Sequence, residues 1–365
     1  MEKSVFIDWL DRYFKGIVVR VVEKVNEANE EKLTYMFKSM LRKEFSVTGK
    51  WESVNVLSSR VSADFVALNS SLPLKSRDSI GKVSGDIVKS GMELYLDEAQ
   101  LQAMDTMVAT GATDAEIVAK LFEDTPKVIT GIYELMERCF LEGFSSGVTM
   151  IDDKDNVGLG VRIDYGYLDS NKSGVKVLWS NANDATPLDD LRKMIDKAND
   201  AGNPVSDVYM DDATFEQFAS SKQVKDFYAW SLKVASGAVV PAPSLEDLNA
   251  ALGRDSRYNV TIHVVKRKIK VERDGKKKVV TPWSAGKIIL TGSTEVGVLA
   301  YAKLAEENHP VAGVSYQKAD GYILVSKFRE NRPHVAEFTS SQARVVPVIC
   351  NVEGIYQIDT KVIQG

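Results

Sequence analysis

The first 46 residues carry apolar side chains at intervals of three and four positions, in two runs. This spacing places the apolar side chains on one face of a helix, and such a face needs a surface to pack on. The pattern therefore predicts helices within residues 4–46, in a segment that serves as an arm or a docking element. The two runs are Phe6, Trp9, Leu10, Tyr13, Phe14 and Val21, Val25, Leu33, Met36, Met40.

A long polar stretch follows this segment. Residues 50–69 are rich in β-branched side chains and alternate weakly, whereas residues 72–98 read LPLKSRDSIGKVSGDIVKSGMELYLDE, with three glycines and four serines. The second part is too polar for a core, and connections longer than about 12–15 residues tend to be functional. Together the two parts predict a long hairpin or extended loop with a polar tip.

Helical patterns dominate between Leu96 and Gly147. In DTPKVITGIYELMERCFLEGFSSG, Thr125 is a candidate N-cap, Pro126 takes the first helical position and Gly147 follows the end. A helix of about 20 residues is roughly 30 Å long. We therefore expect the longest helix of the chain at about residues 126–146.

Strand and helix patterns alternate in the rest of the chain. An apolar stripe predicts a helix through residues 187–202, with Gly202 at its C-cap. A strand-like run before Asp211 and Asp212 predicts a strand followed by a capped helix. The pair Asp274-Gly275 predicts a two-residue hairpin, and the last 30 residues are β-rich. The fold class predicted from these alternations is α+β.

Composition and charge exclude little. The 365 residues are 44% hydrophobic and 27% charged, with a formal net charge of −5, which is ordinary for a soluble globular protein. The mild acidity argues against a dedicated nucleic-acid binder. We expect a soluble, cytoplasmic protein, because the N-terminus lacks a signal-peptide pattern and no window approaches the roughly 18 apolar residues of a membrane span.

Motifs that carry catalysis or cofactor binding are missing from the sequence. Cys139 and Cys350 have no ligand spacing and are interpreted as buried small hydrophobic residues. The sequence NVGLGVRIDYG has Ile163 where a dinucleotide motif needs glycine. Three pairs of adjacent aspartates lie at predicted turns and helix starts, where capping explains them. We expect no cofactor and no metal.

One basic concentration occurs, at residues 266–278. Lys266, Lys268 and Lys270 share one face of a predicted strand, with Ile269 and Val271 opposite, which favours a solvated face that protects a strand edge. Contact with nucleic acid or with a charge-complementary protein is the alternative. The basic residues are Lys266, Arg267, Lys268, Lys270, Arg273, Lys276, Lys277 and Lys278.

The order of these elements resembles that of the tailed-bacteriophage major capsid proteins of the HK97 fold. Their chains run from an N-terminal arm through a long two-stranded E-loop, a peripheral P-domain with a spine helix, and an axial A-domain, back to the P-domain. Residues 72–102 resemble the passage from E-loop to P-domain, and residues 124–143 resemble the spine helix. Residues 207–227 resemble an A-domain strand and helix, and residues 338–359 the closing P-domain strands.

The resemblance implies boundaries for each part of the chain. The expected division is 1–46 for the N-terminal arm, 47–95 for the E-loop, 96–180 for the P-domain with its spine helix, 181–330 for the A-domain and 331–365 for the C-terminal return to the P-domain. An E-loop lies over a neighbouring subunit, so its charged residues are candidates for intersubunit contacts. These candidates are Lys75, Arg77, Asp78, Lys82, Asp86 and Lys89.

The implied function is that of a major capsid protein, which builds pentamers and hexamers of an icosahedral virion around double-stranded DNA. The implied partners are other copies of the chain, a separate scaffolding protein, a portal, and packaged DNA contacted without sequence specificity, with assembly in the host cytoplasm and no membrane. Some members of the family cross-link an E-loop lysine to an asparagine. Lys75, Lys82 or Lys89 with Asn351 are candidates, but nothing in the sequence identifies the set, so no catalytic residue is assigned.

Two alternatives stay open at the level of the sequence. The first is an encapsulin-like nanocompartment shell protein of the same fold, which encloses protein cargo instead of a genome. The second is an enzyme with an unrecognised site in the α+β region, since fold alone does not determine function. Packaged DNA, packaged protein or turnover by a monomer would distinguish the three.

Overall fold

The computed structural model describes residues 2–4, 6–26, 35–55, 81–151, 160–233, 241–273, 275–331 and 335–364. The chain divides into two compact units, each assembled from several stretches of sequence. Unit 1 comprises Met1–Trp51, Ser84–Arg138 and Val298–Val348, and unit 2 comprises Glu52–Val83, Cys139–Gly297 and Ile349–Gly365. Helices and strands occur in both units, which confirms the predicted α+β composition.

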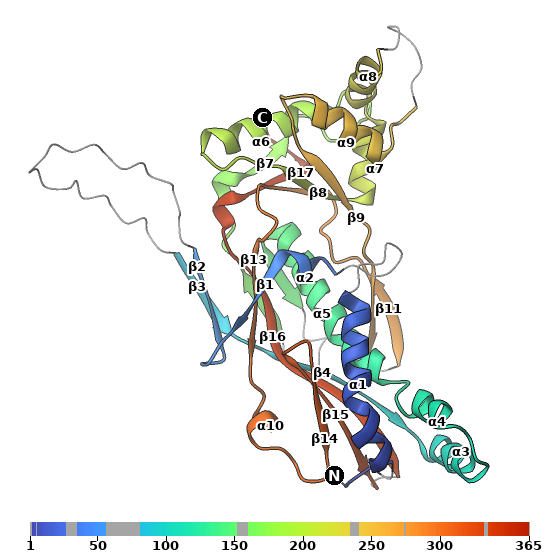
Figure 1. Cartoon of the computed structure of the whole chain (residues 1–365). Coiled ribbons are helices and arrows are strands. Elements are labelled where there is room, and N and C mark those ends of the chain that lie inside the picture. Colours follow the sequence, from blue (N-terminus) through green and yellow to red (C-terminus); the bar gives the residue numbers. More distant parts are fainter. Residues whose placement is uncertain are drawn as a thin grey trace, which may run out of the picture. The chain divides into compact units, whose positions relative to one another are not determined.

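Unit 1 contains a six-stranded sheet (Figure 1). The strand order is β1-β13-β16-β15-β14, and β4 also pairs with β16. Both β4 and β15 run antiparallel to β16, the longest strand. The end of the polar stretch, residues 89–96, is therefore a sheet strand. The bounds are β1 Leu41–Phe45, β4 Lys89–Leu96, β13 Gly297–Ala302, β14 Ser315–Ala319, β15 Ile323–Glu330 and β16 Ala336–Ile349.

Helices of unit 1 bury apolar faces at the predicted spacing. Helix α1 lies along β14 (Figure 1), and its Leu10, Phe14 and Val18 are buried. The ring of Phe14 stacks on that of Phe122 at 5.8 Å between centroids. The bounds are α1 Ile7–Asn26, α2 Met36–Met40, α3 Glu98–Ala109, α4 Asp114–Leu121 and α10 Ala305–Asn308.

The helix prediction for residues 4–46 is confirmed in α1 and α2 and wrong in β1. Leu41 directly follows α2, and the chain continues as a strand that pairs with β13. A strand partner more than 250 residues away decides this conformation, and tertiary pairing of this kind overrides local propensity. Leu33, which belongs to the predicted apolar run, lies outside the described residues.

Helix α5, Thr125–Ser146, is the predicted long helix. Gly147 has φ +82° and donates its N–H to the Gly143 carbonyl, as expected for a glycine that ends a helix. The prediction of Thr125 as N-cap is wrong. Thr125 is itself the first helical residue, and its fully buried hydroxyl finds no hydrogen-bond partner among the described residues.

Unit 2 contains a five-stranded mixed sheet with the order β7-β17-β12-β8-β9. Strand β12 runs antiparallel to β17 and β8, whereas β17 pairs with β7, and β8 with β9, in parallel. The bounds are β7 Lys172–Val175, β8 Asp207–Asp211, β9 Thr261–Val265, β12 Lys287–Thr291 and β17 Ile355–Ile363. The last strand confirms the β-rich tail.

Four helices pack with this sheet around one core. The predicted stripe of α6, which includes Leu191, Met194 and Ala198, is buried together with sheet residues such as Val208 and Leu290. Asp211 precedes α7 as the predicted N-cap residue. Its carboxylate, however, accepts hydrogen bonds from the Thr214 hydroxyl and the Gly286 N–H. The bounds are α6 Pro187–Asp200, α7 Asp212–Ser220, α8 Lys222–Ser231 and α9 Leu245–Arg254.

Three further strand pairs occur, each as a two-stranded sheet. Strands β10 and β11 form the predicted hairpin, with Arg273 opposite Lys276 and Gly275 at φ +71° between them. Strands β2 and β3 flank residues 56–80, which lie outside the described part of the chain (Figure 1). The bounds are β2 Lys50–Asn55, β3 Gly81–Asp86, β5 Val148–Ile151, β6 Val161–Asp164, β10 Ile269–Arg273 and β11 Lys276–Val280.

Candidate functional sites

The structure tests the predicted contact residues only in part. Lys75, Arg77 and Asp78 lie outside the described residues, as does the side chain of Lys82 in β3. Asp86, the last residue of β3, is exposed. Their role between subunits therefore stays a prediction.

Lys89 begins β4 and has a partner within its own unit. Its Nζ lies 3.7 Å from Glu306 Oε1, and 53% of its side chain is exposed. An exposed pair of this kind is worth about 0–1 kcal/mol. Lys89 can therefore exchange Glu306 for another acidic partner at small cost.

The base of the strand pair β2–β3 is fixed to unit 1 by backbone and side-chain contacts. The Ile87 N–H donates to the Gly49 carbonyl at 2.9 Å. Arg344 of β16 donates from Nη2 to the same Gly49 carbonyl at 3.3 Å and from Nε to the Ile87 carbonyl at 3.4 Å. The buried Trp51 covers Gly85, where an added Cβ would lie 2.8 Å from the indole nitrogen. These contacts therefore anchor the start of β2 and the end of β3 within unit 1.

Strand β4 continues this base into the sheet. Eight residues, from Lys89 to Leu96, pair in register with β16. At Gly91 the strands approach so closely that a Cβ would lie 2.8 Å from the Ser341 carbonyl oxygen. Met92 packs on Gly131 of α5, at a point where the helix presents no side chain. Glycines at these two crossings let strand and helix approach closely.

Glu137 of α5 fixes the start of α2. Its two carboxylate oxygens accept hydrogen bonds from the N–H groups of Met36 and Phe37, each at 3.1 Å. These donors belong to the first turn of α2, where N–H groups lack partners within the helix and a negative charge is favourable. Since α2 has only five residues, this buried acid supplies stability that the short helix cannot supply itself.

Asp320 lies in the turn between β14 and β15, and a second polar cluster forms around its carboxylate. Its carboxylate lies 3.1 Å from Lys38 Nζ, 2.6 Å from Lys43 Nζ and 3.2 Å from the Tyr133 hydroxyl. The Lys38 ammonium also lies 3.7 Å from the centre of the Tyr133 ring. The cluster joins the segment after α1 to α5 and to the sheet, so it positions the N-terminal segment within unit 1.

Burial and charge oppose each other in this cluster. Burial alone would raise the pKa of Asp320, but hydrogen bonds and charges from Lys43 and Lys38 outweigh it and lower the pKa below its usual value. Burial lowers the pKa of Lys38, and the attraction of Asp320 offsets this only in part. Asp320 is therefore ionised at neutral pH.

Lys327 is a fully buried cation on β15. Its ammonium donates to the Leu121 carbonyl and to the Thr339 hydroxyl, each at 2.8 Å. It also lies 5.1 Å from the centre of the Phe122 ring. Burial lowers its pKa to about 8, against the opposing attraction of Glu337 and Asp124. The side chain ties the end of α4 to the sheet.

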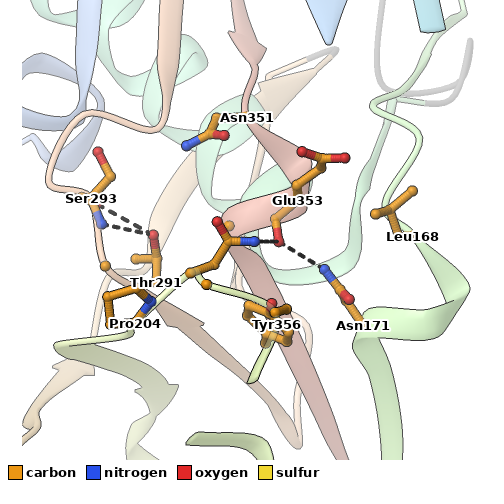
Figure 2. Close-up of a pocket in the computed structure, with 13 residues that line it drawn as sticks. Leu168, Asn171, Pro204, Thr291, Ser293, Asn351, Glu353 and Tyr356 are labelled. Atoms are coloured by element: carbon orange, nitrogen blue, oxygen red, sulfur yellow. Dashed lines mark hydrogen bonds between the residues drawn. The ribbon is translucent and has the colours of Figure 1, made fainter. Parts of the chain in front are cut away.

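A polar cavity of about 590 Å³ lies in unit 2, beside the ends of β12 and β17 (Figure 2). The Glu353 carbonyl accepts hydrogen bonds from the side-chain amides of Asn171, at 2.9 Å, and Asn203, at 3.5 Å. Asn351, a cross-linking candidate, lies at the rim with φ +54°. Among the described residues that line it there is no lysine, histidine or cysteine, and the polar side chains are amides, hydroxyls and the one carboxylate of Glu353.

Predictions about individual groups have mixed outcomes. Cys139 is buried as expected, whereas Cys350 is only half-buried. Across the described ranges, no three or more His, Cys, Asp or Glu side chains are grouped to hold a metal ion. None of the helices that the structure describes combines the length and apolarity required to cross a membrane.

Sequence reasoning missed the side chains that organise unit 1. Glu137, Asp320, Lys327 and Arg344 each bind groups from a distant part of the chain. Asp320, with φ +52°, directly follows β14 and looks in the sequence like an ordinary turn residue. No local pattern marks these four residues, since their partners lie about 100 to 300 positions away.

Comparison with known proteins gives one family match and a set of similar structures. A family model described as phage major capsid protein E matches residues 89–357. A search of curated proteins found no match. A protein described as a prophage capsid protein of Escherichia coli CFT073 shares 14% identity at a TM-score of 0.57, over 94% of this chain and 98% of that one. A phage-related protein of Bordetella bronchiseptica RB50 shares 11% identity at a TM-score of 0.52, over 96% and 98%.

Proposed function

Because this chain belongs to the phage major capsid protein E family, we propose that it forms pentamers and hexamers, which close an icosahedral head around double-stranded DNA. As a member of this family the chain is a subunit of a phage shell, and its fold is the HK97-like α+β fold. The observation that carries this proposal is the family match over residues 89–357. It includes β4, α5 and β16, and it ends within the first residues of β17. We further propose that the protein's role is structural and that it has no enzymatic activity.

The base of β2 and β3 supports a role for residues 56–80 in joining subunits. Gly49, directly before β2, and Ile87, directly after β3, are both hydrogen-bonded to Arg344. The segment is polar at its end, with Lys75, Arg77 and Asp78. An anchored base with a long polar extension suits an element whose packing partner is another subunit.

Scaffolding and portal proteins are the proposed partners of assembly in the host cytoplasm. Identical subunits in pentamers and hexamers meet at slightly different angles, so local contacts alone define shell size poorly. A separate scaffold supplies the missing curvature, and a portal supplies the opening for DNA. Packaged DNA is proposed to contact the shell without sequence specificity, because phosphate contacts carry no sequence information.

Electron microscopy of the expressed chain, alone and with a candidate scaffolding protein, tests the proposal. We expect closed shells of uniform size, and nuclease-protected DNA in particles assembled with the packaging components. Shells that enclose protein and never DNA would favour the encapsulin-like alternative. A chain that stays monomeric under every condition, scaffold included, would contradict the proposal.

A further inference from the structure

The hairpin of β10 and β11 carries positive charge that the described residues of unit 2 neutralise only in part. We call residues 266–280 the basic hairpin; they contain eight basic and two acidic residues. Its strands pair only with each other, as a two-stranded sheet. Ile269 is buried at the base. A two-stranded ribbon is marginally stable by itself in water, so a binding partner would stabilise this one.

Most lysines of the basic hairpin lack a counterion. Lys266 pairs with Asp212 at 2.8 Å and Lys277 with Glu272 at 3.5 Å. Within the described part of the chain, no ion pair engages the remaining lysines, all of which are exposed. These unpaired lysines are Lys268, Lys270, Lys276 and Lys278.

The mixture of side chains fits a protein surface better than a nucleic acid. Register places Lys270 opposite Val279 and Val271 opposite Lys278, so apolar residues lie beside the cations. Val279 is 56% exposed, and Glu272 lies on the same ribbon, where it would repel phosphates. A complementary surface should therefore be acidic and partly apolar.

The chain itself carries such a surface, on α3 and α4. Residues 97–124, which we call the acidic helix pair, contain seven acidic residues and one basic residue. Glu98 and Asp105 of α3 are exposed, one above the other at a spacing of seven, and form no ion pair with any described residue. Val108, one turn from Asp105, is 42% exposed. Acidic and apolar groups thus lie on adjacent positions.

We propose that the basic hairpin of one copy binds the acidic helix pair of a second copy of this chain. The inference rests on the proposed function, because it requires a shell in which copies meet. Each copy carries both surfaces, so the contact is heterologous and repeats from subunit to subunit. Charge complementarity of this kind accelerates association and selects the partner, and it weakens as salt rises.

Charge reversal on each side tests the contact. The hairpin variant carries Lys276→Glu and Lys278→Glu, and the helix variant carries Glu98→Lys and Asp105→Lys. We expect each variant by itself to assemble at least about tenfold more slowly than wild type in light scattering at low salt. An equimolar mixture should recover part of the rate, because contacts between unlike copies again join surfaces of opposite charge, whereas contacts between like copies do not. Lys15→Glu with Lys24→Glu, two exposed lysines of α1, gives a control with the same charge change.

Each other outcome has a distinct meaning. If wild type forms no shells even with scaffold, the proposed function is wrong and the contact is rejected with it. If wild type and the hairpin variant assemble at equal rates, the contact alone is rejected. Normal shells that lose nuclease-protected DNA would assign the basic hairpin to nucleic acid instead. Rescue in a chain with all four substitutions, but not in the mixture, would contradict a contact between copies.

Discussion

Buried polar side chains in unit 1 join segments that are distant in sequence. Glu137 binds the first turn of α2, Asp320 binds Lys38 and Lys43, and Lys327 binds the end of α4. A buried charge is costly unless hydrogen bonds compensate it. Each of these three groups has charged or backbone partners, so removing one partner exposes the full cost of burying the other.

Replacing Glu137 with alanine should destabilise the unassembled chain by about 2–4 kcal/mol. The substitution leaves the N–H groups of Met36 and Phe37 without their acceptor in a buried place, and an unsatisfied buried donor costs about 1–3 kcal/mol. Urea unfolding followed by fluorescence measures the loss. Asp105→Ala, at an exposed acid, is the control and should stay within about 0.5 kcal/mol of wild type. Equal midpoints for the two variants would contradict this role of Glu137.

Lys327 should make stability depend on pH above neutrality. Its pKa is about 8 in the folded chain and about 10.4 in an unfolded one. Between these values the unfolded state binds more protons, so the free energy of unfolding rises with pH. Compared with Lys327→Met, wild type should gain about 2 kcal/mol from pH 8 to pH 10.

The control for this measurement is the exposed Lys318, replaced by methionine. The difference between wild type and Lys318→Met should vary little over the same pH range, because the Lys318 side chain is exposed to solvent in the folded chain as it is in the unfolded one. A flat difference for Lys327→Met as well would mean that the folded chain does not hold Lys327 as a buried, partly deprotonated amine.

At the scale of elements, local sequence signals were sufficient where an element is defined by its own residues. The α6 stripe, Gly147 after α5 and the turn at Gly275 all led to correct elements. Strand β1 was missed because its conformation depends on pairing with β13. The strand β4 likewise has a polar sequence, and only its pairing with β16 and its crossing on α5 explain why it is ordered.

Two glycines in unit 1 should respond oppositely to replacement by alanine. Gly91→Ala places a Cβ 2.8 Å from a backbone oxygen of β16, which cannot move without disturbing the sheet, so we expect a loss of about 1–3 kcal/mol. Gly16 of α1 has no atom within 4 Å of an added Cβ. Gly16→Ala should therefore gain about 0.5–1 kcal/mol from helix propensity. Thermal unfolding of both variants checks this, and a loss at Gly16 or a gain at Gly91 would refute the packing argument.

At the scale of the whole molecule, the sequence indicated the fold class and the family, but not the sites. Element order survives great sequence divergence, as the 14% identity to a protein of the same fold illustrates. A role between subunits depends on partners outside the chain, so for all six candidates it can be judged only in an assembly. Lys89 pairs with Glu306 within unit 1. A candidate for a contact between subunits can therefore also form an ion pair within its own subunit.

Shortening the segment between β2 and β3 should separate folding from assembly. Replacing residues 60–76 with Gly-Ser-Gly leaves β3, β4 and the Arg344 contacts in place. We expect the circular dichroism and melting temperature of the unassembled chain to stay close to those of wild type, and shells to be absent in electron microscopy. The control is a Gly/Ser segment of the original length. It keeps the length of the segment but removes its side chains, so it shows whether assembly requires the length or the side chains. Normal shells from the shortened chain would exclude residues 60–76 as a subunit-joining element.

The antiparallel ladder between β4 and β16 has a mechanical consequence. Residues 56–80 lead through β3 to the Lys89 end of β4, so tension on them would reach the sheet at Lys89 and would pull β4 along its own axis when it acts in line with the strand. A pull in this direction loads the hydrogen bonds of eight residue pairs at once, in shear, whereas a pull across the strands would open them one after another. Arg344, at the point where tension enters, braces the first pair against peeling. In a shell assembled as proposed, the pairing of β4 with β16 would thus help each subunit resist outward force.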